Sequence, residues 1–255
     1  MSWASKRQFL YFAGALFVFI VVLALPTFFL VYTPPTCSDK IQNQGELGVD
    51  CGGPCSILCK ADALDIIVHW QRAFKVKDGV YNALAYVENP NLNSGVSKLV
   101  YRFKFYDSDN ILISERKGET FIPPNKIFGV FESNITTGSR VPARTIFEFL
   151  DSPVWQKNFS QDPVFLITNK LLFDKDNLPR LTASLENHTT DAPYSVEVVA
   201  ILYDATGNAV AVSKTVVDSP AKDSSVPLIF TWPEQFGTPV VRTELTYRVV
   251  PSNSF

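Results

Sequence analysis

An uncharged apolar segment near the N-terminus constrains this chain more than any other feature. Residues 9–32 contain no charged side chain. A helix of this length, at a rise of about 1.5 Å per residue, crosses a hydrocarbon core of about 30 Å. A buried helix of a soluble protein would normally show a polar stripe, and none is present here. The segment therefore predicts a single transmembrane helix over residues 9–32.

A cleaved signal peptide is the main alternative to a membrane anchor. Its apolar region would usually run for about 7–15 residues and end at a site with small residues. Here the apolar run is longer and ends in Val-Tyr-Thr-Pro-Pro-Thr, which offers no such site. We therefore expect an uncleaved signal-anchor.

Basic residues on the two sides of the span predict its orientation. Lys6 and Arg7 lie just before it, and the first basic residue after it is Lys40. Because basic residues are retained on the cytoplasmic side, we expect residues 1–8 to form a cytoplasmic tail. The predicted localisation is the plasma membrane, with a single pass and the bulk of the chain extracytoplasmic.

The four cysteines of the chain all fall in one glycine-rich segment, residues 36–60. They are Cys37, Cys51, Cys55 and Cys59. A segment this short and this poor in apolar residues cannot bury a core, so we expect covalent or metal staples. An even count in an oxidising compartment predicts two disulfides, and the sequence does not choose among the pairings. A zinc site is the alternative, although the Cys-x2-Cys spacing of common zinc knuckles is absent.

The same segment carries oxygen-bearing side chains at intervals of three or four residues. They are Asp39, Asn43, Glu46 and Asp50. Calcium takes carboxylate and amide oxygens from flexible loops, so these residues form a candidate calcium site, although the pattern matches no EF-hand. The alternative is a solvated loop in which the same side chains cap turns.

A resemblance to known proteins also lies in this segment. The run Asn43-Gln-Gly-Glu-Leu-Gly-Val-Asp-Cys-Gly-Gly-Pro-Cys55 resembles a short motif, N-x-x-E-x-G-x-D-C-G-G-x-C, of many bacterial surface and secreted proteins. In those proteins the motif is a small module near the membrane or beside β-domains. The resemblance implies a bacterial envelope protein, and it implies no reaction.

The rest of the chain contains an internal repeat at a shift of about 98 residues. Four landmarks recur in order: Glu88-Asn89 with Glu186-Asn187, Tyr106-Asp107 with Tyr203-Asp204, Ile111-Leu112 with Ala209-Val210, and Arg144-Thr145 with Arg242-Thr243. Repeats at a fixed shift indicate tandem structural units. We therefore predict two domains, residues 63–153 and 163–251.

Each copy reads as short strands separated by turns, because apolar residues alternate with polar ones over several runs. In the first copy the predicted strands are Ile66–Trp70, Tyr81–Glu88, Leu99–Tyr106, Ile111–Arg116, Ile127–Glu132 and Thr145–Leu150. In the second they are Val164–Thr168, Leu181–Glu186, Val196–Tyr203, Ala209–Thr215, Val226–Thr231 and Glu244–Val250. The pattern predicts an all-β chain of two tandem immunoglobulin-like β-sandwiches after one transmembrane α-helix and a small cysteine-rich loop segment.

The Tyr-Asp pairs carry a second resemblance. Phe103-Lys-Phe-Tyr-Asp107 and Ala200-Ile-Leu-Tyr-Asp204 are similar to the motif of the FxLYD family of bacterial immunoglobulin-like domains. The first copy has Phe in place of Leu, and the second lacks the leading Phe. Residues 156–162 form a short polar linker, which predicts that the two domains lie end to end.

Composition and motifs argue against several functions. With 23 Lys and Arg against 25 Asp and Glu, the chain shows no basic surplus for nucleic acid. No nucleophile elbow, phosphate-binding glycine loop or His-based metal motif is present, and the two histidines, His69 and His188, fall in different copies. We therefore expect no enzyme, and no cofactor apart from the candidate calcium ion and the alternative zinc site of the cysteine segment.

The leading interpretation is a membrane-anchored extracytoplasmic protein for binding or scaffolding. It would contact lipid through residues 9–32 and a protein or cell-surface partner through the edges and loops of its sandwiches. The alternatives are an accessory subunit of a cell-envelope secretion or pilus-type assembly and a hydrolase with an unrecognised site.

Overall fold

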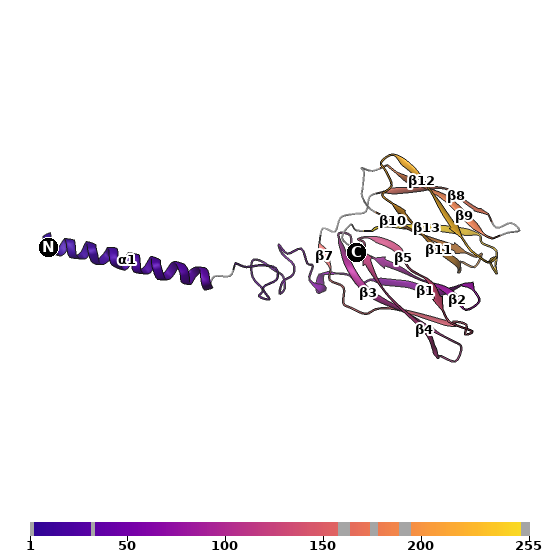
Figure 1. The fold of residues 1–255 in the computed structure, drawn as a ribbon, viewed down its shortest axis with the longest axis horizontal. Coiled ribbons are helices and arrows are strands. Elements are labelled where there is room, and N and C mark those ends of the chain that lie inside the picture. The colour runs from indigo at the N-terminus through magenta and orange to yellow at the C-terminus, as the bar shows by residue number, and fades with distance from the viewer. Residues whose placement is uncertain (1–2, 32–33, 158–163, 174–177, 189–194, 251–255) are drawn as a thin grey trace. The chain divides into compact units, whose positions relative to one another are not determined.

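The computed structural model of this chain is mostly antiparallel β-sheet after one N-terminal helix (Figure 1). It describes residues 3–31, 34–157, 164–173, 178–188 and 195–250. Two compact units are present, Met1–Cys55 and Ser56–Phe255. The first unit holds the helix and most of the cysteine segment, and the second holds the strands.

Helix α1 spans Trp3–Val31, so it begins before the predicted start at residue 9 and includes Lys6 and Arg7. Over Trp3–Phe28 it is long and apolar enough to cross a membrane, and none of it is buried inside the protein. These properties fit a membrane anchor or a signal sequence.

Pro26 lies inside α1 and removes one backbone N–H from the helix. The hydroxyl of the next residue, Thr27, donates to the carbonyl oxygens of Leu23 at 2.5 Å and Ala24 at 3.1 Å. Thr27 thus has its own polar group satisfied within the helix, as a membrane-spanning helix requires.

The strands of the described residues follow a short 3-10 helix at Lys60–Asp62. They are β1 (Ile67–Lys77), β2 (Val80–Asn89), β3 (Ser94–Tyr106), β4 (Leu112–Ile122), β5 (Lys126–Thr136), β6 (Arg144–Phe149), β7 (Gln156–Lys157), β8 (Phe165–Phe173), β9 (Arg180–Asn187), β10 (Ser195–Tyr203), β11 (Ala209–Asp218), β12 (Ser224–Thr231) and β13 (Arg242–Val250). Every predicted strand overlaps an observed one. Strand β7 was not predicted: it starts the expected linker and pairs with β3, whereas residues 158–162 of that linker lie outside the described residues.

One strand order occurs twice. Strands β1–β6 (the first half) form the sheets β1-β2-β5 and β4-β3-β6, with β7 added to β3. Strands β8–β13 (the second half) form the sheets β8-β9-β12 and β11-β10-β13. Replacing each strand of the first half by its counterpart in the second reproduces both orders, so the repeated landmarks mark equivalent strands. The predicted domain limits, 63–153 and 163–251, stay a prediction.

Each half has one hydrophobic core, to which both of its sheets contribute. In the first half, β2 supplies Ala83, Ala85 and Val87, and β3 supplies Tyr101, Phe103 and Phe105. In the second half, β9 supplies Leu181, Ala183 and Leu185, and β10 supplies Val198, Ala200 and Leu202. Every second residue points inward, as the pleat of a strand requires.

A third buried cluster joins the two halves. From the first half it contains Phe74 and Leu84, with Trp70, Tyr86 and Phe131 packed against them; from the second it contains Val199, Ile201, Tyr203, Ala209 and Val212. Sheet β1-β2-β5 therefore faces sheet β11-β10-β13. The four sheets stack with a buried cluster between each neighbouring pair, and sheets β4-β3-β6 and β12-β9-β8 are the outer ones. The expectation that the domains lie end to end was wrong.

The landmark asparagines have the same role in both halves. Asn89 ends β2 and Asn187 ends β9, and both are fully buried. The Asn89 amide donates to the carbonyl of Pro123 at 2.8 Å, and the Asn187 amide donates to that of Pro220 at 2.8 Å. Each amide thereby fixes the loop that leads into the third strand of its sheet, β5 or β12, and satisfies a buried carbonyl.

The Tyr-Asp landmarks also coincide. The Oδ1 atoms of Asp107 and Asp204 each accept hydrogen bonds from the backbone N–H groups two and four residues further on, at 2.9–3.0 Å. Such bonds are typical of an aspartate that organises a turn. The conserved spacing between the two copies thus reflects one turn used twice, between β3 and β4 and between β10 and β11.

Candidate functional site

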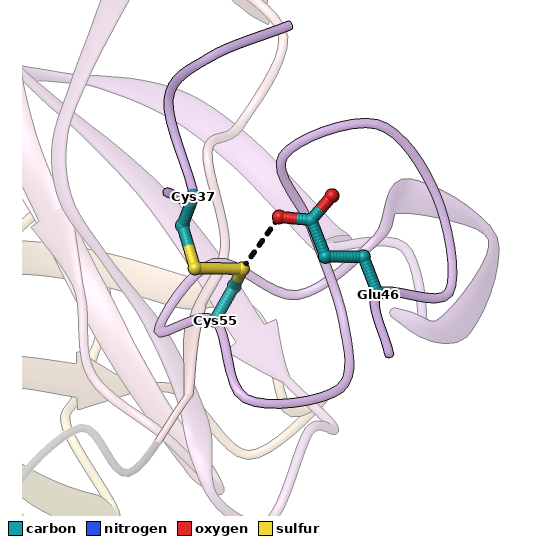
Figure 2. A group of neighbouring side chains, drawn as sticks. All are labelled: Cys37, Glu46 and Cys55. Carbon is teal, nitrogen blue, oxygen red and sulfur yellow. Dashed lines mark hydrogen bonds between the residues drawn. A yellow bond between two sulfur atoms is a disulfide. The ribbon is translucent and has the colours of Figure 1, made fainter. Parts of the chain in front are cut away.

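The cysteine segment brings a disulfide and a buried carboxylate together (Figure 2). Cys37 and Cys55 form a disulfide with a Cα–Cα distance of 5.6 Å. Glu46 is only 6% exposed, and its Oε1 lies 3.0 Å from the Sγ of Cys55. Cys51 and Cys59 are disulfide-bonded as well, so the prediction of disulfides in this segment is confirmed.

Glycine is required where this loop crosses itself. Gly53 has a φ of +51°, in the left-handed region that favours glycine. A Cβ atom at this position would lie 2.1 Å from the carbonyl oxygen of Gly45, which is backbone and cannot move aside cheaply. The glycines of the segment therefore allow the close approach that places Glu46 beside the disulfide.

The second oxygen of Glu46 holds the loop in shape. Its Oε2 accepts the backbone N–H of Asp50 at 3.2 Å and that of Asn43 at 3.4 Å. A buried carboxylate needs such partners because its desolvation would otherwise be costly. Glu46 therefore connects the backbone at Asn43 and Asp50 to the disulfide and stabilises the loop from inside.

Two of the other predicted calcium ligands, Asp39 and Asp50, also accept backbone hydrogen bonds. Asp39 accepts the N–H of Ile41 at 2.9 Å and the side-chain amide of Asn43 at 2.8 Å, and this amide is the main reason that the pKa of Asp39 is lowered. Both carboxylate oxygens of Asp50 lie 3.1 Å from the N–H of Lys40. These bonds are those of the turn-capping alternative, and calcium binding stays a prediction.

Among the described residues, one group of three or more His, Cys, Asp or Glu side chains is close enough to share a metal ion. It consists of Cys37, Glu46 and Cys55, whose ligand atoms lie within 4.8 Å of one another. The two sulfur atoms are bonded to each other, so neither is a thiolate that zinc could bind. With Cys37 and Cys55 joined in a disulfide, the group acts as a covalent crosslink and not as a metal centre.

The surroundings of the disulfide disfavour thiol exchange. Cys55 is 2% exposed, so an attacking thiol is restricted to the sulfur of the partly exposed Cys37. The neighbouring Glu46 carboxylate also disfavours the thiolate that exchange would release, since like charges repel. Closing a loop with a sequence separation of 18 residues stabilises the folded segment by about 3 kcal/mol in the chain-entropy model. The geometry therefore indicates a structural role.

A buried ion cluster lies between the two halves and was not predicted. Arg248 contacts Glu197 through Nε at 2.7 Å and donates to the hydroxyl of Thr120 in the first half at 2.6 Å. Burial raises the pKa of Glu197, but the nearby Arg248 and Lys214 outweigh it, and the net pKa is lowered. The cluster is one of several polar contacts between the halves, together with the bond from Arg72 to the Ala209 carbonyl and that from Tyr86 to Glu244.

An apolar surface on the outer sheet β12-β9-β8 was also missed. It consists of Leu166, Leu171, Phe173 and Ile229, which are 51%, 57%, 56% and 48% exposed (the outer apolar face). The prediction ended this strand at Thr168, but β8 continues through Phe173 after an irregularity between Thr168 and Leu171. The break in alternation concealed the surface.

The histidines lie outside the cysteine segment and the ion cluster. His69 contacts Glu88 at 2.7 Å and His188 contacts Glu186 at 3.2 Å, each at an exposed position. No protein-family model and no curated protein matches the chain. The two resemblances therefore depend on the motifs themselves.

Proposed function

We propose that this chain is a membrane-anchored extracytoplasmic protein for binding or scaffolding, without a catalytic site. One observation carries the proposal: the apolar helix ends at Val31, and Cys37, a few residues later, is already in a disulfide. Lipid is the solvent in which a helix without a protein cover is stable, and disulfides persist on the oxidising side of a membrane. Lys6 and Arg7 at the other end favour a cytoplasmic N-terminus.

The two halves serve as immunoglobulin-like domains of the FxLYD type in this proposal. Their support is the shared strand order, one core per half, and the Tyr-Asp pairs that end β3 and β10 at the same turn. The motif Gly48-Val-Asp-Cys-Gly-Gly-Pro-Cys55 supports a bacterial envelope protein, because the resemblance places it near membranes and beside β-domains.

Partner binding is assigned to the sheet edges and loops. Strands β4 and β6 end one outer sheet, and β12 and β8 end the other. Edge strands offer backbone N–H and C=O groups to an added strand, which is a common mode of peptide recognition. The charged outer surface of β3 and the outer apolar face of the second half then give the two sides different partners.

The topology is tested in whole cells with the full chain, tagged at either terminus. We expect external protease to remove the C-terminal tag, whereas the N-terminal tag is cut only after lysis. The mass of the mature chain, measured by mass spectrometry, should show that residues 9–32 are retained. Maleimide added without reductant should label no cysteine. A chain that begins after residue 32, or one with free thiols, would contradict the proposal.

Exchanging the helix distinguishes an anchor from a subunit contact. If α1 only anchors the chain, then an unrelated apolar span with the same flanking Lys6 and Arg7 leaves partner co-purification unchanged. Loss of partners after the exchange, with the chain still inserted and folded, would instead favour an accessory subunit of an envelope assembly. A truncated chain with a cleavable signal peptide is the control for anchoring itself.

A further inference from the structure

The outer apolar face occupies the position that the first half buries. Leu84 of β2 and Thr182 of β9 are equivalent, since the shared landmarks Glu88 and Glu186 lie four residues further on in each strand. By the strand registers, Phe74 and Phe131 then correspond to Phe173 and Ile229. Phe74 is 5% exposed because a second sheet covers it, whereas Phe173 is 56% exposed. The outer apolar face therefore keeps apolar side chains on its edge strands, at positions that the first half covers with a second sheet, whereas its central strand carries Thr182 and Ser184 where β2 has Leu84 and Tyr86.

A head-to-tail arrangement of copies does not fit this face. It would place the outer apolar face of one copy on the outer face of β3 in the next, repeating the contact between the halves. There, Arg102 and Lys104 stand where β10 has Val199 and Ile201. Burying these cations with Glu148 under apolar side chains would be unfavourable. The chain's own repeat therefore cannot continue into a filament.

The strand register arranges this face in four rows across β8, β9 and β12. They are Leu166, Glu186, Ser225; Thr168, Ser184, Pro227; Leu171, Thr182, Ile229; and Phe173, Arg180, Thr231. The first and last rows have matching chemistry at each position: apolar on β8, charged on β9, hydroxyl on β12. The two charges are opposite in sign.

We propose that two copies of this chain dimerise through the outer faces of β8, β9 and β12, related by a two-fold axis. The axis is parallel to the sheets, perpendicular to the strands, and passes between the two middle rows. It therefore places the first row of one copy opposite the last row of the other. Leu166 then meets the Phe173 position of the second copy, and Glu186 meets its Arg180. Facing sheets pack about 10 Å apart and stay within about 30° of alignment, which keeps the central strands in register.

The symmetry makes each charge pair occur twice. Arg180 is exposed and Glu186 is partly exposed, so both can reach a facing sheet, although the Glu186 carboxylate also contacts Thr168 at 2.6 Å and His188 at 3.2 Å within its own copy. Within one copy they lie at opposite ends of β9, about 20 Å apart at the rise of an extended strand, and cannot pair. An isologous interface of this kind closes on itself, so the assembly stops at two copies. The helices would add to it by confining both copies to one membrane surface.

The test uses the full chain in detergent micelles, with its mass measured by sedimentation equilibrium over a range of concentrations. We expect a reversible dimer of the wild type. Leu171→Lys should weaken dimerisation at least about tenfold, as a lysine would be buried without a partner. Leu92→Lys is the matched control, because Leu92 is an equally exposed leucine (65%) in the first half, and it should change nothing.

A charge exchange tests the axis itself. Arg180→Glu and Glu186→Arg should each weaken the dimer about tenfold, because each brings like charges together. The double variant should restore wild-type affinity, since the proposed axis pairs these two residues between copies. The thermal midpoints of all variants should stay within a few degrees of the wild type.

Three results would overturn the proposal: a monomeric wild type, an unchanged dimer in Leu171→Lys, or a double variant no better than the single ones. None of them bears on the topology or on partner binding, because a monomer can be anchored and bind equally well. A dimer held by α1 would remain unchanged in Leu171→Lys.

Discussion

Strands β3 and β10 are equivalent in the repeat, yet their outward faces have opposite character. Strand β3 presents Arg102 and Lys104, which pair with Glu148 at 2.5 Å and 2.8 Å. Strand β10 presents Val199 and Ile201, which are buried against the first half. The inward faces of both strands are apolar. The comparison teaches that a repeated fold is maintained by the inward residues, whereas the outward residues decide which sheet another sheet can cover.

Exchanging one outward residue gives the largest expected effect. Ile201→Lys should lower the free energy of unfolding by about 3–5 kcal/mol, because it buries an unpaired charge between the halves. The reciprocal change, Lys104→Ile, should alter it by less than about 1 kcal/mol, since that face is partly exposed. Urea denaturation of the full chain in detergent measures both. Equal effects would show that the two outward faces do not differ in role.

The buried asparagines should behave alike in the two halves. Asn89→Ala and Asn187→Ala each leave loop carbonyls without their donor, and each should cost about 2 kcal/mol. Replacement by Asp would keep the size but lose the donor, and should cost at least as much. Urea denaturation again provides the measurement. A loss of stability in only one of the two variants would show that the two asparagines do not share the same structural role.

Acid should affect the more buried carboxylate, Glu197, more than the less buried one, Glu148. The folded-state pKa of Glu197 is lowered, so its stabilisation is present above its unfolded pKa, near 4.5, and is lost as pH falls through the lower folded value. Glu197→Gln should therefore flatten the fall in stability below about pH 4.5. Glu148, whose pKa is lowered by Lys104 and Arg102, is the less buried counterpart.

Glu148→Gln should flatten the same profile less, because solvent screens its ion pairs. Thermal midpoints from pH 2.5 to 7 would measure both variants. A larger change in Glu148→Gln would reverse the expected order and count against the importance of the ion cluster between the halves.

The smallest effects are expected at the landmark arginines. Arg242 lies over the Tyr203 ring at 3.7 Å, and Arg144 lies over the Tyr106 ring at 4.9 Å. Arg242→Ala should cost about 1 kcal/mol and Arg144→Ala about 0.5 kcal/mol, since cation–π contacts strengthen as they are desolvated. Burial also raises the pKa of Tyr203 to about 12. A spectroscopic titration of tyrosine in Arg242→Ala provides a second measurement, that of the pKa of Tyr203.

Much of the fold was predictable from local pattern. The strands in both halves follow from alternation, because a pleated strand between core and solvent needs that pattern. The end of β8 was not predictable, since the irregularity after Thr168 shifts the alternation by one residue. The near-continuous apolar runs of β2 and β10 did indicate burial on both faces. The prediction assumed that one face of each strand was exposed to solvent, and therefore missed this.

The candidate sites divide in the same way. The presence of disulfides followed from composition and compartment, whereas the pairing of Cys37 with Cys55 depends on how the loop closes. The acidic residues of the loop were recognisable, but their use as acceptors for backbone N–H groups depends on turns that sequence spacing does not define.

The sequence by itself determined an apolar helix of membrane length, the cysteine-rich loop and two sets of short strands with matching landmarks, because each is visible in the composition, alternation or spacing of the residues. Only the tertiary structure decided that Arg248 reaches Thr120, that sheet β1-β2-β5 faces sheet β11-β10-β13, and that Phe173 remains exposed where Phe74 is buried. Those outcomes depend on which sheet faces which, and contacts between residues more than a hundred positions apart leave no periodic trace in the chain.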